Sequence, residues 1–144
     1  MIEQHRFGVK LMHLPRAWRS ELDRRLADKG LSQARWLVLI HLGHCEQPPT
    51  QRELAEHIGI ESPTLARTLD ALEHSGLIER QPCKKDRRVN KVLLTSQANE
   101  LVQSLEEIAC KVREEIFAGI DMEEVLRCQA LLKQMLNNLS RNNI

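Results

Sequence analysis

Residues 50–70 read TQRELAEHIGIESPTLARTLD, a stretch that predicts two short helices joined by a tight turn. Thr50, with a glutamate three residues later, has the spacing of a capping box, so the first helix should begin there. Gly59 suits the left-handed position that stops a helix. Ser62 can cap the second helix, and Pro63 suits its first position. The stretch therefore predicts a helix-turn-helix.

Two short segments that resemble β-strands follow the helix pair, with a basic loop between them. Residues 77–81 and 91–95 have the composition of two strands of a hairpin. Residues 80–91 contain six Lys or Arg against one acid. Such cations repel one another on a free surface, and an anionic partner relieves that repulsion. This local patch bears more on phosphate binding than the net charge of +1 does.

Long amphipathic helices are predicted on both sides of this region. One apolar stripe runs from Phe7 to Leu26 in three- and four-residue steps, and Pro15 within it is expected to kink the helix. A further helix should follow Ser32, and two more stripes cover residues 98–116 and 125–139. The predicted order is four helices, a hairpin and two helices. That order indicates a mainly α (α+β) fold, and 144 residues suit a single domain.

The second helix of the pair has the composition of a helix that enters a major groove. Leu65, Leu69 and Leu72 should face the core, which leaves small or flexible residues on the other side. Among them, Arg67 could fork onto the O6 and N7 atoms of guanine. The basic loop beyond could place an arginine in the adjacent minor groove, where narrow A·T tracts concentrate negative potential.

The chain resembles the MarR/SlyA family of winged-helix transcription regulators over nearly its whole length. The most specific motif is Asp86-Arg87-Arg88 in the predicted wing. The other matching pieces are Gln51-x-x-Leu54-Ala55-x-x-Ile58-Gly59-Ile60, Thr64-Leu65-x-Arg67-Thr68-Leu69-Asp70-x-Leu72-Glu73-x-x-Gly76-Leu77-Ile78-x-Arg80 and Leu94-Thr95. Trp18-Arg19 and Leu31-x-x-x-x-Trp36 look like the SlyA branch in particular.

The resemblance implies an obligate homodimer that binds palindromic DNA as a repressor or an activator. Residues 1–30 and 96–144 would be the dimerisation helices, and residues 31–95 the winged helix-turn-helix. The half-sites would lie about one helical turn apart. Arg88 would be the minor-groove arginine, Asp86 the residue that orients the wing, and Arg67 a major-groove contact.

Residue pattern and resemblance together predict an extended DNA-binding surface on the helix pair and the wing. Its members are Ser62, Pro63, Thr64, Arg67, Thr68, Ala71, Arg80, Lys84, Lys85, Asp86, Arg87, Arg88 and Lys91. Free backbone N–H groups at the start of the second helix would favour a phosphate there.

Members of this family often respond to small aromatic carboxylates such as salicylate. Arg16, Arg19 and Trp36 resemble the corresponding pocket, with arginines for a carboxylate and an indole for a ring. The alternative is that Trp36 is core and the arginines only bridge helices. Pro15 departs from the SlyA-like pattern beside this site.

Two sensing alternatives rest on other side chains. Cys83 lies beside Lys84 and Lys85, and nearby cations lower the pKa of a thiol, so a redox-sensing regulator of the same fold is possible. His41 and His44 lie three residues apart on one helix, with Cys45 beside them, and could share a metal. Nothing in the sequence identifies the further ligands that a metal would need. No metal site or cofactor is therefore predicted.

Other functional classes find less support in the sequence. The chain contains no G-x-S-x-G, no Gly-rich phosphate loop and no H-E-x-x-H, so no enzyme is predicted. Aromatic residues are only 3%, with no Tyr, which disfavours a base-stacking single-strand binder. No apolar run suggests a signal peptide or membrane span, so a cytoplasmic location is expected. A winged helix that binds protein rather than DNA remains open.

Overall fold

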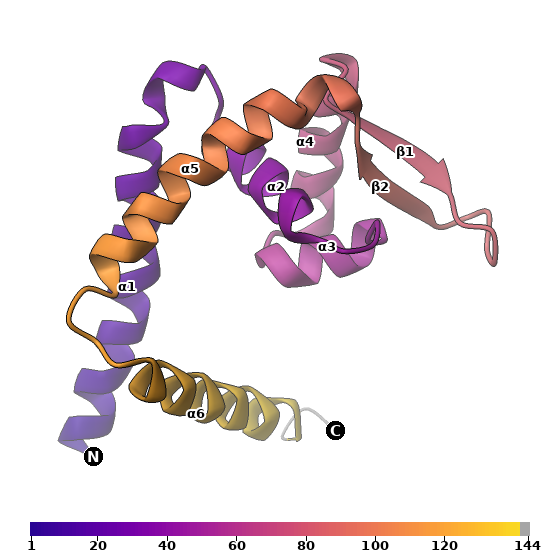
Figure 1. The fold of residues 1–144 in the computed structure, drawn as a ribbon. Coiled ribbons are helices and arrows are strands. Elements are labelled where there is room, and N and C mark those ends of the chain that lie inside the picture. Colours follow the sequence, from indigo (N-terminus) through magenta and orange to yellow (C-terminus); the bar gives the residue numbers. More distant parts are fainter. Residues whose placement is uncertain (142–144) are drawn as a thin grey trace. The chain divides into compact units, whose positions relative to one another are not determined.

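The computed structural model describes residues 1–141, and the chain divides into two compact units. The first unit runs from Met1 to Val112, and the second begins at Arg113. In chain order the elements are α1 (Ile2–Arg25), a 3-10 turn (Ala27–Lys29), α2 (Gln33–His44), α3 (Gln51–Ile58), α4 (Ser62–His74), β1 (Ile78–Pro82), β2 (Asn90–Leu94), a 3-10 turn (Ser96–Ala98), α5 (Asn99–Ile116) and α6 (Met122–Arg141) (Figure 1). The predicted order of helices and hairpin is confirmed.

The core of the first unit lies between α2, α3, α4, α5 and the inner face of the hairpin. Its large, fully buried side chains include Trp36, Leu39, Leu54, Leu65, Leu69, Leu72, Ile78, Val92 and Leu105. The strands pair antiparallel, with Ile78 opposite Leu94 and Pro82 opposite Asn90. The carbonyl of Pro49 accepts a hydrogen bond from the N–H of Val92 at 2.9 Å, which ties the base of the hairpin to the segment before α3. The arrangement is a winged helix-turn-helix.

The turn chemistry of the helix pair follows the sequence closely, with one shift at α4. Thr50 and Glu53 form the reciprocal capping box, with hydrogen bonds of 3.1 and 2.7 Å. Gly59 ends α3 with φ of 72°, a conformation that a residue with a Cβ rarely adopts. Ser62 was predicted to cap α4, but Ser62 is already helical and Glu61 occupies the N-cap without a side-chain capping bond. Pro63 still suits the first turn, because the missing N–H would have no helical partner there.

The outer helices differ in how much of their surface is covered. α1 continues through Pro15 as one helix, and its buried residue is Leu22. α5 packs onto α2, where His44 Nε2 lies 2.8 Å from Glu106 Oε2. In the second unit, α6 has no buried residue. Within residues 1–141, no helix combines the length and apolar character needed to cross a membrane.

Acidification is expected to destabilise the fold in a window set by His41. This half-buried side chain lies on α2, with its ring centroid 6.1 Å from that of His57 on α3. Burial, followed by the charges of His57, His44 and Arg19, lowers the pKa of His41 below its ordinary value of 6.5. The unfolded chain therefore binds more protons than the folded chain as the pH falls below about 6.5, and stability falls with it.

The measurement is the free energy of unfolding of the parent protein and of His41→Gln, each determined between pH 7.5 and 5. The variant should show a shallower pH dependence than the parent in this window, whereas His5→Gln, an exposed substitution on α1, should leave it unchanged. The carboxyl groups whose pKa is lowered, such as Glu53 and Asp86, act only at lower pH. An unchanged profile in His41→Gln would mean that another group sets the window.

Candidate nucleic-acid interface

The exposed side of α4 presents part of the predicted groove-reading surface. Ser62, Pro63 and Arg67 are exposed, and Thr64 and Ala71 are partly so. Thr68 is only 8% exposed, and its hydroxyl donates to the carbonyl oxygen of Thr64 at 3.0 Å. The predicted outward orientation of Thr68 is therefore wrong. The reason lies in the helical repeat, since residues four apart share a face and Thr68 lies on the side of buried Leu72.

The wing loop is shaped by its one acidic residue. Asp86 Oδ1 accepts a hydrogen bond from the backbone N–H of Arg88 at 3.0 Å and one from its Nε at 3.2 Å. These bonds hold the pKa of the Asp86 carboxyl below its usual range. The N–H of Cys83 donates to the carbonyl of Val89 at 2.7 Å, which closes the loop. The Arg88 side chain is nevertheless 91% exposed, so its guanidinium is held at one end and open to solvent.

The remaining wing cations divide between the loop and its base. Lys84, Lys85 and Arg87 are exposed. Lys91, in β2, is partly exposed and pairs with Gln81 of β1. Its backbone also forms an isolated antiparallel β-bridge with Thr50. The structure thus places three further cations beside Arg88 and the fourth at the base of the wing.

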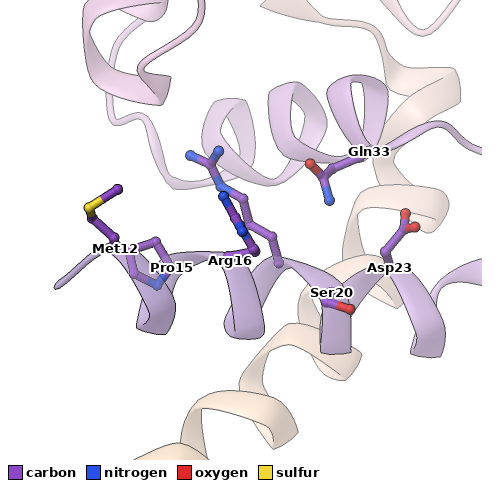
Figure 2. Close-up of a pocket in the computed structure, with 7 residues that line it drawn as sticks. Met12, Pro15, Arg16, Ser20, Asp23 and Gln33 are labelled. Atoms are coloured by element: carbon purple, nitrogen blue, oxygen red, sulfur yellow. The ribbon is translucent and has the colours of Figure 1, made fainter. Parts of the chain in front are cut away.

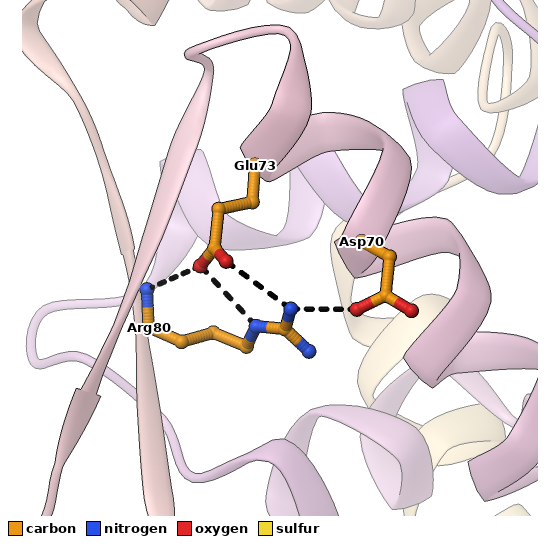
Figure 3. Close-up of polar contacts among 3 residues, drawn as sticks. All are labelled: Asp70, Glu73 and Arg80. Atoms are coloured by element: carbon orange, nitrogen blue, oxygen red, sulfur yellow. Dashed lines mark hydrogen bonds and ion pairs between the residues drawn. The ribbon is translucent and has the colours of Figure 1, made fainter.

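Arg80 was predicted to contact DNA, but its guanidinium is directed at two carboxylates of α4 (Figure 3). One Nη lies 2.6 Å from Asp70 Oδ1 and 3.2 Å from Glu73 Oε1, and the side chain is 21% exposed. The pKa of Glu73 is lowered, first by its hydrogen bond with Arg80. The sequence offered a signal for this contact, since the two acids lie three residues apart on one helix face.

The contacts of Arg80 determine which acidic side chains remain available to pair with Arg67. No hydrogen bond or ion pair engages the Arg67 side chain within residues 1–141. The acids that could have paired with it on α4, Asp70 and Glu73, are both held by Arg80. Arg67 therefore remains available to an external acceptor, and both carboxylates beside it are engaged by one guanidinium.

A pocket of about 420 Å³ lies between α1 and the start of α2 (Figure 2). It is lined by Met12, Pro15, Arg16, Arg19, Ser20, Asp23 and Gln33. The structure thus brings together the two predicted arginines, and it adds a carboxylate and an amide that the sequence did not suggest. Trp36, the third predicted residue, does not line this pocket. Its side chain is 1% exposed, and Nε1 donates to Asp23 Oδ1 at 3.1 Å.

The side chains considered for redox and metal sensing have structural partners. The pKa of the Cys83 thiol is lowered, chiefly by hydrogen bonds from the backbone of Lys85 and Asp86. His44 contacts Glu106, and Cys45 Sγ donates to the carbonyl of His41 at 3.2 Å. Across residues 1–141, no group of three or more His, Cys, Asp or Glu side chains is arranged to hold a metal ion.

Comparison with known proteins identifies the scaffold that carries this surface. Residues 31–89 match the model of the MarR family. The chain is 50% identical to a transcriptional regulator designated PA3341, whose crystal structure superposes with a TM-score of 0.86 over 94% of this chain and 98% of that one. It is 26% identical to a MarR family transcriptional regulator from Silicibacter pomeroyi, with a TM-score of 0.79 over 92% and 89% of the two chains.

The winged helix extends to more distant relatives as a shared fold. The transcriptional regulator SlyA is 21% identical and superposes with a TM-score of 0.76 over 94% of this chain and 95% of that one. At that identity the likeness concerns the fold alone.

Proposed function

Because the chain belongs to the MarR family of transcriptional regulators, we propose that it binds duplex DNA sequence-specifically, as a homodimer on palindromic operators. The single observation that carries this proposal is the distribution of charge on the first unit. Arg67 and Arg88 are exposed to an external anion, while Asp70 and Glu73 of α4 are both engaged by the single guanidinium of Arg80. A helix and a wing with these cations match the major and minor grooves of one DNA half-site.

The predicted surface supplies contacts of two kinds. Arg67, with Ser62, Thr64 and Ala71 around it, is suited to base edges, because small neighbours let the helix approach them. Lys84, Lys85, Arg87, Arg88 and Lys91 surround the wing and are suited to phosphate and the minor groove. Selection of bound sequences from a random duplex library tests the proposal. An enriched palindrome is expected; enrichment of no sequence, with tight capture of a protein partner instead, would favour a protein-binding winged helix.

The homodimer is supported by the surface of α6. At about 3.6 residues per turn, the exposed side chains of Met122, Leu126, Leu136 and Leu139 lie on one side of this helix, and six large apolar side chains are exposed in all. They are Met122, Leu126, Leu131, Met135, Leu136 and Leu139. An exposed apolar surface of this kind is typical of a protein interface. In a two-fold homodimer, the same surface of each copy would pack against its counterpart. Two copies related by a two-fold axis would present two α4 helices to a palindrome.

Introducing charge into this apolar surface is expected to shift the chain from dimer to monomer. Leu126→Asp with Leu136→Asp would bury carboxylates in an apolar interface, which is costly without partners. Sedimentation equilibrium is the measurement, and binding to a two-half-site duplex should weaken in parallel. Gln134→Asp, which adds charge on the opposite side of α6, is the matched control. A dimer that survives the double substitution would place the interface elsewhere.

Release of DNA by a small aromatic carboxylate is a narrower part of the proposal. Arg16 and Arg19 line the same pocket and could pair with a carboxylate. Asp23 also lines it, which would oppose an anionic ligand unless Arg16 and Arg19 outweigh it. Titration calorimetry with salicylate tests this, and binding should be lost in Arg16→Ala with Arg19→Ala. Equal affinity in the parent and the double variant would exclude this pocket as the site.

A further inference from the structure

We propose that Arg80 is the positioning residue that fixes the wing against α4, so that Arg67 and Arg88 reach the same DNA half-site. Arg80 itself contacts no DNA atom. This inference rests on the proposed DNA binding. In this proposal the side chain of Arg80 joins the two DNA-contacting elements, α4 and the wing.

The link is formed by both the backbone and the side chain of Arg80. Its backbone N–H donates to Glu73 Oε2 at 3.0 Å, and its Nε donates to the same oxygen at 3.2 Å. One Nη then reaches Glu73 Oε1 at 3.2 Å and Asp70 Oδ1 at 2.6 Å. Because Asp70 and Glu73 are three residues apart, they present their carboxylates on one face of α4. A planar guanidinium that meets two carboxylates in this way fixes direction as well as distance.

Arg80 lies in the middle of β1, next to the part of the wing that extends from the core. Alternate residues of a strand share a face, so Ile78, Arg80 and Pro82 lie on the same side of β1. Exposure rises along that face: Ile78 is 2% exposed, Arg80 is half-buried by its two carboxylates, and Pro82 is exposed. An isolated two-stranded hairpin is marginally stable in water. The ion-pair network therefore adds a side-chain attachment on β1 to the backbone contacts that β2 makes with Pro49 and Thr50.

Charge and exposure argue against a phosphate contact by Arg80. Its side chain is 21% exposed, compared with 91% for Arg88. Moving it to a phosphate would leave two carboxylates of α4 uncompensated beside the DNA. The same network keeps Arg67 free, since its neighbouring acids are occupied.

A double-mutant cycle between Arg80 and Arg88 tests the proposal. Arg80→Met keeps most of the side-chain volume and removes the donors. If Arg80 acts by placing the wing, Arg88→Ala should cause little further loss of affinity in the Arg80→Met background, because the wing contact is already lost. Chemical footprinting should show guanine N7 protection retained and minor-groove protection reduced. Losses that multiply, with both protections intact, would overturn the proposal and favour a separate phosphate contact.

Glu73→Ala gives a second test that keeps the Arg80 charge. It removes a carboxylate near the proposed DNA surface, so a purely electrostatic effect would tighten binding. Positioning instead predicts weaker binding and the same loss of minor-groove protection, and tighter binding would contradict it. Thermal unfolding of each variant checks that the chain folds. If the parent protein fails to bind duplex DNA, the proposed function fails; if the parent binds and the cycle is additive, only the role of Arg80 fails.

Discussion

Replacing Arg88 with alanine is expected to weaken binding to every duplex, whatever its sequence. The guanidinium projects from the wing with 91% of its side chain exposed, and Asp86 holds its Nε and backbone N–H. A cation of this kind adds attraction to the duplex without reading base edges in the major groove. The plot of log affinity against log salt should therefore become shallower by about 1 for each wing that loses its contact. Fluorescence anisotropy over a salt series is the measurement.

The control for this prediction removes one arginine charge at a position outside the proposed DNA-binding surface. Arg6→Ala takes an exposed arginine from an i,i+3 pair with Glu3 on α1. It should leave both affinity and slope near those of the parent. If Arg88→Ala matches this control, the wing does not contact DNA. If Arg88→Ala instead alters the discrimination between base pairs that differ at their major-groove edges, the assignment of Arg88 to the minor groove is wrong.

Replacing Arg67 with alanine is expected to lower affinity for the preferred operator and relax its sequence preference. A bidentate arginine–guanine contact contributes about 1–3 kcal/mol of discrimination, and a palindrome contains two such contacts. The loss should be concentrated at one base pair in each half-site. Binding to unrelated duplex DNA should change much less than in Arg88→Ala.

A change in the DNA provides the sharpest control for Arg67. Substituting 7-deazaguanine for the preferred guanine removes the N7 acceptor and should weaken binding by the parent protein. The same substitution should have little effect on Arg67→Ala, because the donor is already missing. Equal losses in the parent and the variant would show that another residue reads that base.

The helix pair and the wing could be predicted because local chemistry determines them. The capping box at Thr50 and the left-handed glycine at Gly59 depend on residues within a single turn, and both are observed. The hairpin follows from two short strand-like segments on either side of a basic loop, and its strands lie within a residue of the predicted ranges. At the start of α4 the same reasoning misplaced the N-cap by one residue, since both Glu61 and Ser62 can precede a first-turn proline.

The surroundings of Arg80 and Trp36 come from distant parts of the chain, so local patterns could not decide their roles. The destination of Arg80 depends on how β1 packs against α4, which no local pattern specifies. Of the two roles that the sequence allowed for Trp36, tertiary packing favours the core residue over the ligand contact, because the side chain is buried and its N–H donates to Asp23. Thr68 is a different kind of miss, because the helical repeat places it beside Leu72 and would have predicted its burial.

The most direct test of DNA binding is the affinity of the parent protein for mixed-sequence duplex DNA across a salt series. We predict binding at low salt, with log affinity falling linearly against log salt at about 0.9 per phosphate neutralised. The slope should be steepest for the parent and shallower for Arg88→Ala. Absence of binding even at low salt, or an affinity independent of salt, would contradict the account.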